Sequence, residues 1–112
     1  MSTLTAQRCV PCEGGVQPLT LTEAQALMKQ LASQWQLADD AKSIRAEWQF
    51  KNFYHAMSFV NAVAHLANTE DHHPDLEVGY GYCRIKYHTH AIGGLSSNDF
   101  ICAAKIDALP RT

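Results

Sequence analysis

The sequence has little of what a protein needs to bind nucleic acid or to cross a membrane. Its 112 residues contain 9 lysines and arginines against 11 aspartates and glutamates, and the basic residues form no cluster. Because nucleic-acid binding usually needs a basic surface, this balance argues against it. No apolar run approaches the roughly 18 residues of a membrane-spanning helix, and residues 1–10 lack the apolar stretch of a signal peptide. We therefore expect a soluble, cytoplasmic protein that binds neither nucleic acid nor membranes.

The four cysteines lack the spacing of a complete metal site. Cys9 and Cys12 have the CxxC spacing of half a zinc site or of a redox pair, but no second pair at ligand spacing follows. Cys83 and Cys102 fall at apolar positions of a predicted strand and helix, where a reduced thiol behaves as a small hydrophobic group. We therefore favour an N-terminal arm that carries a CxxC sequence without a metal.

The length permits one domain with a single two-layer core, because a chain of this size cannot enclose two cores. The hydrophobic content of 46% and the charged content of 18% are typical of a globular protein. Residues 1–19 are rich in glycine and proline and show no periodicity, so they are expected to form an irregular arm. Residues 20–112 are expected to form the folded domain.

The spacing of apolar residues predicts three helices. The first covers about 22–34, and Thr22 has the capping-box spacing to Gln25. The second is the longest; it follows Asn52 as an N-cap and carries an apolar stripe at positions 53, 57, 60, 64 and 67. The third follows Ser96 and ends near the C-terminus.

Short runs of alternating apolar and polar residues predict four strands in two hairpins. The first hairpin joins 35–38 to 44–50, and the second joins 76–80 to 83–89. The resulting order is α-β-β-α-β-β-α. Hairpins separated by helices are typical of an α+β domain, so we expect a four-stranded antiparallel sheet with three helices on one face.

Three histidines are the strongest candidates for chemistry. His72 and His73 end the second helix directly before Pro74, and His90 follows on the last strand. An imidazole exchanges protons near neutrality, because its ordinary pKa is roughly 6.5. With Asp71, these side chains suit either a metal site or acid–base catalysis. Adjacent helical residues point about 100° apart and do not easily bind one ion together, so we favour catalysis or binding without a metal.

Three motifs surround these histidines: Asp71-His72-His73-Pro74, then Thr89-His90, then Gly94-Leu95-Ser96 with Asp99. Together they resemble the motifs of the pterin-4a-carbinolamine dehydratase family. The resemblance covers residues 20–109 and is far more specific than any lone histidine. It implies dehydration of 4a-hydroxytetrahydropterin to the quinonoid dihydropterin, with no metal and no organic cofactor.

The same resemblance assigns roles to individual residues. Loss of water from a carbinolamine needs an acid for the leaving hydroxyl and a base for the N5 proton. By resemblance, His72 and His90 form this pair, in an order that the sequence leaves open, while His73 and Asp71 orient the pterin. The further residues expected to bind substrate are His88, Thr89, Ala91, Trp35 and Asp99. Trp35 suits core packing equally well, and Asp99 suits a helix cap equally well.

The resemblance also implies partners and an alternative. The dehydratase reaction recycles the pterin used by aromatic amino acid hydroxylases, which implies a functional link to phenylalanine hydroxylase. The alternative is a non-catalytic protein of the same fold that acts in assembly or as a dimerisation cofactor. Such a protein is expected to lose site histidines, and this chain keeps all three. An exposed sheet edge makes a homodimer or homotetramer plausible.

One geometric requirement follows from the strand pattern. Strict alternation places His90 on the sheet face opposite the helices. For His90 to approach His72, the strand has to twist or bulge near Thr89.

Overall fold

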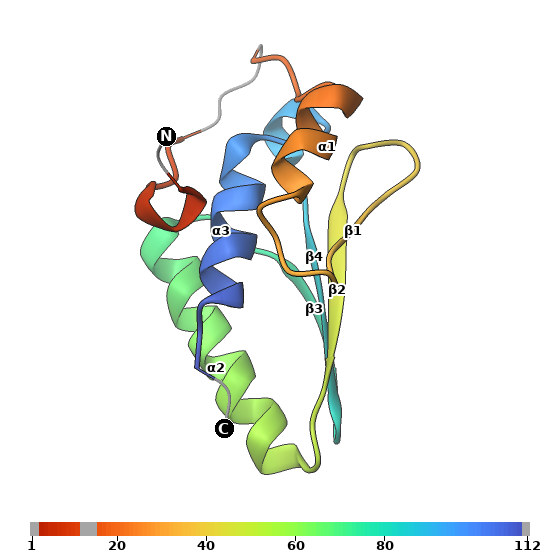
Figure 1. The fold of residues 1–112 in the computed structure, drawn as a ribbon. Coiled ribbons are helices and arrows are strands. Elements are labelled where there is room, and N and C mark those ends of the chain that lie inside the picture. Colours follow the sequence, from red (N-terminus) through yellow and green to blue (C-terminus); the bar gives the residue numbers. More distant parts are fainter. Residues whose placement is uncertain (1–2, 12–15, 111–112) are drawn as a thin grey trace.

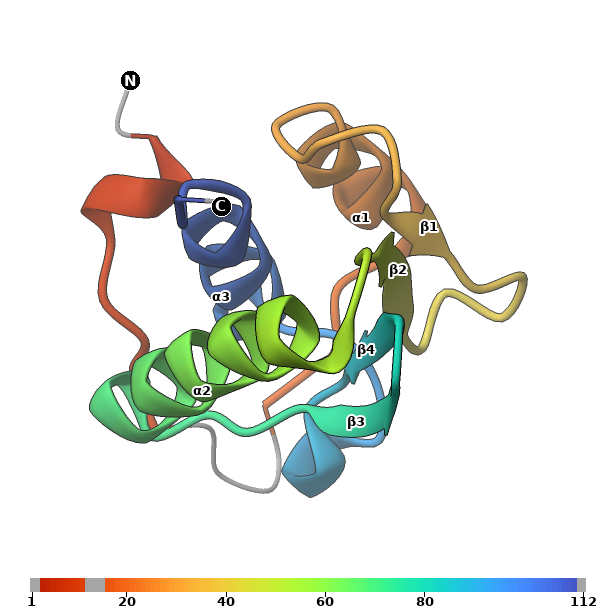
Figure 2. The ribbon, with the colours of Figure 1, turned by 90° about the horizontal axis from the view of Figure 1, so that it is seen from below.

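The computed structural model describes residues 3–11 and 16–110 of the chain. Cys12, and with it the CxxC pair as a unit, lies outside the described residues. Figures 1 and 2 show two layers, a twisted sheet with the three α-helices on one of its faces. The predicted α+β fold is therefore confirmed. Among the described residues, no helix is both long and apolar enough to cross a membrane.

The first hairpin pairs β1 (Gln36–Leu37) with β2 (Ile44–Gln49). Along β2, buried and exposed residues alternate without interruption, as the sequence pattern predicts. The side chains at 44, 46 and 48 face the helices. Trp48 packs between Trp35 and Phe59, with ring centroids 5.5 and 4.9 Å away. This aromatic cluster joins the sheet to the helical layer.

The second hairpin pairs β3 (Asp75–Gly79) with β4 (Tyr82–Tyr87). The strand order is β1-β2-β4-β3, and every neighbouring pair is antiparallel. The two hairpins therefore meet through β2 and β4, which place Ile44 opposite Tyr87 and Trp48 opposite Cys83. This central pairing brings the C-terminal end of β4 into the middle of the sheet.

The first helix, α1 (Leu21–Met28), differs from its predicted range at both ends. Its capping box uses Thr20 and Glu23 instead of Thr22 and Gln25, because the Thr20 side chain accepts from the Glu23 amide and the Glu23 side chain accepts from the Thr20 amide. The helix ends early because the amides of residues 29–31 bond three residues back in a tighter turn. The next free amide, on Ala32, donates to the Asp107 carboxylate at 2.8 Å.

The longest helix, α2 (Phe53–Glu70), begins as predicted, with the Asn52 side chain accepting from the His55 amide at 2.9 Å. Its buried stripe is offset from the predicted one. The buried apolar positions are 56, 59, 60, 63 and 67, whereas Phe53 is half exposed.

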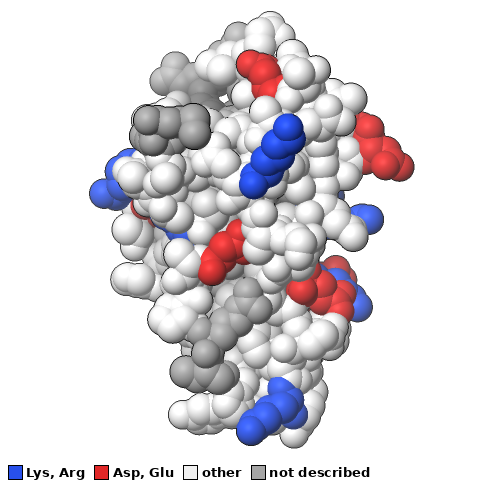
Figure 3. All heavy atoms as spheres, viewed as in Figure 1, with Lys and Arg blue, Asp and Glu red and all other residues white. Residues whose placement is uncertain are grey.

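The last helix, α3 (Ser97–Asp107), is the most deeply buried of the three and has the predicted Ser96–Asp99 capping box. The arm expected to be irregular contains one 3-10 turn, η1 (Leu4–Ala6). This turn forms because Leu4 is buried in the main core. On the face shown in Figure 3, acidic and basic side chains are scattered among one another.

Candidate active site

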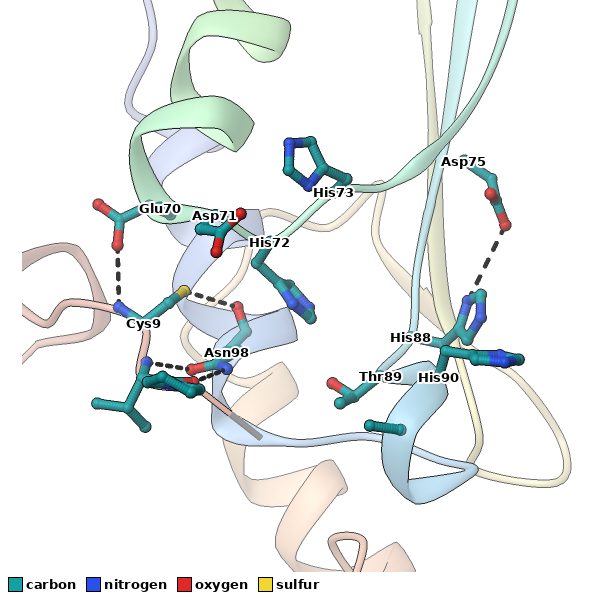
Figure 4. A pocket seen from close by; sticks show the side chains of 13 residues that line it. Cys9, Glu70, Asp71, His72, His73, Asp75, His88, Thr89, His90 and Asn98 are labelled. Atoms are coloured by element: carbon teal, nitrogen blue, oxygen red, sulfur yellow. Dashed lines mark hydrogen bonds and ion pairs between the residues drawn. The ribbon is translucent and has the colours of Figure 1, made fainter. Parts of the chain in front are cut away.

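The sequence Asp71-His72-His73 marks the end of α2, although not as the helical pattern predicts. The helix ends at Glu70, and Asp71 adopts a left-handed conformation with φ of 52°. The amides of Asp71 and His72 return to the carbonyls of Asn68 and Ala67, at 3.3 and 3.1 Å. Both histidines therefore follow the helix. Figure 4 shows them pointing apart, which is the result of a non-helical chain and not of helical geometry.

His72 is held by three contacts with two residues, Asp99 and Tyr87. Its Nε2 atom lies 2.6 Å from Oδ1 of Asp99, and its ring stacks on that of Tyr87, with an interplanar angle of 9° and centroids 5.4 Å apart. The Tyr87 hydroxyl donates to the His72 carbonyl at 3.2 Å. Both the ring plane and the ring rotation are thus determined by fully or partly buried contacts. The nitrogen that does not bond to Asp99 is Nδ1.

Asp99 is fully buried, and its second oxygen is also bonded. Oδ2 accepts from the Thr89 hydroxyl at 2.8 Å and from the Ser96 amide at 3.0 Å. Burial alone lowers the pKa of His72, but the hydrogen bond and negative charge of Asp99 outweigh it, so the pKa of His72 is raised above 6.5. The structure therefore favours the imidazolium form of His72.

His73 has a different partner. Its Nε2 lies 3.0 Å from Oδ1 of Asn68, one turn earlier on α2. The side chain is exposed, and in Figure 4 its ring points away from that of His72. The His73 side chain is therefore less constrained than that of His72.

His90 reaches the site because β4 ends earlier than predicted. The strand stops at Tyr87, Thr89 forms an isolated bridge to Gly94, and His90 begins the 3-10 turn η2 (His90–Ile92). Gly93 closes this turn in the left-handed region, at φ of 66°. The strand alternation thus does not extend to His90. The required change of direction near Thr89 is present as a turn and not as a bulge.

A pocket of about 750 Å³ lies where these segments meet. It collects most of the residues singled out from the sequence, namely Asp71, His72, His73, His88, Thr89, His90 and Ala91. In Figure 4, His72 lies between the end of α2 on one side and His88 and His90 on the other. The rings of His88 and His90 are in edge contact, with centroids 6.3 Å apart, and Nδ1 of His88 lies 4.0 Å from the Asp75 carboxylate.

Two residues expected to bind substrate lie elsewhere. Trp35 is 3% exposed in the core, where its Nε1 donates to Asp107 at 2.9 Å, and it does not line this pocket. Asp99 does not line the pocket either. It bonds to His72 and caps α3, so the expectation of a helix cap is confirmed, while a contact with substrate stays a prediction.

The sequence reasoning missed one side of the pocket. Cys9, Val10 and Pro11 of the arm, together with Glu70 and Asn98, also line it. No spacing pattern could have found them, because the arm meets α3 across 88 residues of chain. In the described part of the chain, no three His, Cys, Asp or Glu side chains are grouped as a metal site would require.

Sequence comparison relates the chain to one family. The family model for pterin 4 alpha carbinolamine dehydratase matches residues 17–109. A Nitrosomonas europaea protein named "Putative pterin-4-alpha-carbinolamine dehydratase" is 59% identical over 106 residues, which cover 95% of this chain and 92% of that protein. A Legionella pneumophila protein of the same name is 51% identical over 108 residues, with 96% of each chain covered.

Solved structures have the same fold. The crystal structure of a transcriptional coactivator/pterin dehydratase from Brucella melitensis superposes with a TM-score of 0.76 at 30% identity, covering 81% of this chain and 96% of that one. A pterin dehydratase-like protein identified as a RuBisCO assembly factor in the alpha-carboxysome gives a TM-score of 0.57 at 20% identity, covering 66% and 86%. The second likeness concerns the fold alone.

Proposed function

Because the chain belongs to the pterin 4 alpha carbinolamine dehydratase family, we propose that it removes water from 4a-hydroxytetrahydropterin to give the quinonoid dihydropterin. The observation that carries the proposal is the pairing of His72 with the buried Asp99 at the wall of a pocket that His90 also lines. A buried carboxylate that orients an imidazole and stabilises its charged form is typical of acid–base sites.

In the proposed reaction, His72 is the acid. Asp99 engages Nε2, which leaves the Nδ1 proton of the imidazolium for the substrate. That proton passes to the 4a-hydroxyl, the C4a–O bond breaks, and water leaves. His90 accepts the N5 proton, and the N5–H bonding pair becomes the second bond between C4a and N5. Because His90 is exposed, it can release its proton to solvent, and His72 regains one for the next cycle.

The other pocket residues are proposed to orient the pterin. His73 and Asp71 lie on the α2 side of the pocket, and His88 and Ala91 lie on the η2 side. The Thr89 hydroxyl already bonds to Asp99 and Ser96, so we assign its contact with substrate to the main chain.

The proposal is tested by generating the 4a-carbinolamine enzymatically and following its dehydration by absorbance. We expect the wild-type protein to exceed the spontaneous rate. His72→Ala and His90→Ala should each lower the rate by about two orders of magnitude or more, in line with general acid–base contributions. His65→Ala, an exposed histidine on α2 outside the pocket, is the matched control. Absence of acceleration by the wild type refutes the proposed activity.

Two further features of the proposal concern partners. We propose that the reaction serves tetrahydropterin recycling beside a phenylalanine hydroxylase, which a coupled assay with that enzyme would test. The alternative, a non-catalytic assembly or dimerisation role, rests on fold relatives such as the RuBisCO assembly factor. It becomes the better reading if the wild-type protein fails to accelerate dehydration.

We also propose that the chain forms a homodimer or homotetramer. Within residues 3–11 and 16–110, β3 has one hydrogen-bonded neighbour, β4, so its other edge is open to pairing. Leu76 and Val78 on β3 are each 37% exposed although they lie opposite the buried Ile85 and Cys83. Sedimentation equilibrium tests this, and a monomer at micromolar concentration contradicts it.

A further inference from the structure

The N-terminal arm is fastened to the pocket by two side chains of the folded domain. Asn98, buried on α3, accepts from the Val10 amide at 3.1 Å and donates to the Val10 carbonyl at 2.6 Å. Glu70, the last residue of α2, accepts from the Cys9 amide at 2.9 Å. One amide side chain thus engages both polar groups of the Val10 backbone, as a neighbouring strand would.

Ion pairs of Glu70 and the burial of Leu4 also hold the arm in place. The Glu70 side chain is 5% exposed and bonds to Lys105 at 2.8 Å, while Arg8 approaches it at 3.1 Å from the arm. Five residues before Cys9, Leu4 is buried in the core. Residues 4–10 of the arm are therefore held at both ends by specific contacts with the folded domain.

This geometry leaves an apolar surface facing the pocket. Val10 is 62% exposed although it is aliphatic, and both Val10 and Pro11 line the pocket. In Figure 4, the arm lies on the side of His72 opposite His88 and His90. The family match begins only at residue 17, so this wall is supplied from outside the matched region.

We infer that Val10 and Pro11 form an apolar wall of the substrate pocket, and that Asn98 and Glu70 are positioning residues that hold this wall in place. The inference rests on the proposed function for its substrate, a flat pterin ring with apolar faces. A ring bound between the histidines and this wall loses apolar surface to water on the arm side, which stabilises the complex. The wall takes no part in proton transfer, so it affects KM and not kcat.

The first test compares two exposed valines. Val10→Ala should raise KM for the 4a-carbinolamine about threefold with kcat unchanged, because part of one apolar contact is lost. Val16→Ala is the control, since Val16 is 52% exposed but does not line the pocket. Equal KM values for the two variants overturn the inference.

The second test separates holding the arm from direct contact with substrate. Asn98→Ala removes both bonds to Val10 and should raise KM about tenfold, with faster hydrogen exchange at the Val10 amide. The Sγ atoms of Cys9 and Cys102 lie 3.5 Å apart, close enough for a disulfide to replace the lost fastening. Diamide supplies the oxidant: it takes one hydrogen from each thiol, becomes the hydrazine, and leaves the Cys9–Cys102 bond.

In an Asn98→Ala, Cys12→Ser protein, diamide treatment should therefore return KM toward the wild-type value, and dithiothreitol should reverse the effect. Adding Cys9→Ser removes the bridge and should abolish the rescue. If the disulfide forms by mass spectrometry but KM stays high, Asn98 does not act through the arm, and the inference fails.

A binding measurement tests the role of the arm without turnover. Equilibrium binding of 7,8-dihydrobiopterin, a pterin that does not undergo the reaction, should show the same loss and rescue as KM. If the wild type binds this pterin but does not dehydrate the carbinolamine, the proposed function fails. The binding affinities of the variants then still test whether the arm contacts the pterin. If binding is unaffected in Val10→Ala and Asn98→Ala, the arm inference fails by itself.

Discussion

Replacing Asp99 with asparagine tests the chemical logic of the site most directly. The substitution keeps the shape of the side chain but removes the charge that raises the pKa of His72. Burial of His72 is unchanged and by itself lowers this pKa, so the pKa of His72 should fall in Asp99→Asn. If His72 is the acid, the rate declines as pH rises through this pKa. The alkaline limb of the pH–rate profile should therefore move to lower pH.

The magnitude follows from the contacts of Asp99. The carboxylate accepts from His72, Thr89 and the Ser96 amide, and hydrogen bonds to a charged group contribute about 1.5 to 3 kcal/mol each. Asparagine retains one acceptor oxygen and can keep part of this network. We expect a loss of about 2 to 3 kcal/mol in the free energy of unfolding. At neutral pH we expect the dehydration rate to fall about tenfold to a hundredfold.

Stability should change with pH in a defined direction. Because the folded-state pKa of His72 is raised above 6.5, its contribution to stability is fully present below pH 6.5 and is lost as pH rises through the folded-state pKa. Urea denaturation of the wild type across this range should show the decline, and Asp99→Asn should not.

The matched control is Asp107→Asn on the same helix. Asp107 bonds to Trp35 and the Ala32 amide, remote from the pocket, so this variant should lose stability without moving the alkaline limb. The assignment of His72 as an acid supported by Asp99 is refuted if circular dichroism shows that Asp99→Asn is folded and the alkaline limb of its pH–rate profile is unchanged from the wild type.

Two further substitutions test the framework around the site. Burial raises the pKa of Glu70, but its hydrogen bonds to Lys105 and to the Cys9 amide outweigh burial and lower the pKa from 4.5 to about 2. The contribution of Glu70 to folding stability is therefore present above pH 4.5 and is lost as pH falls toward 2. Glu70→Gln should lower the free energy of unfolding at pH 7 by about 1 to 2 kcal/mol. This is less than the pKa shift alone would give, because solvent screens the charge of the exposed Arg8. Urea denaturation should also show a weaker loss of stability at acid pH than in the wild type. Trp35→Phe removes the bond to Asp107 and should cost about 1 to 2 kcal/mol in the same assay. Its dehydration rate should match the wild type, and a fall in the rate would restore Trp35 to the site.

The local structure could be predicted from sequence wherever one short-range rule dominated. Alternation along Ile44–Gln49, the Asn52 cap and the Ser96–Asp99 capping box all involve residues at most a few positions apart. The same rules were less accurate at element ends. The first helix stops at Met28 because the amides of residues 29–31 bond three residues back, and the next amide, on Ala32, bonds to Asp107, which is distant in sequence.

The candidate site also combines features determined by the sequence with features determined by the tertiary structure. The sequence by itself determined which imidazoles are candidates for acid–base chemistry, because a proton-exchanging side chain is recognisable from its type and its motif. Only the tertiary structure decided how these imidazoles are arranged. The pairing of β2 with β4 and the packing of α3 set Asp99 behind His72, and the turn after Tyr87 carries His90 into the pocket. The arm across the pocket depends on bonds between residues 61 and 88 positions apart, a separation at which sequence periodicity carries no information.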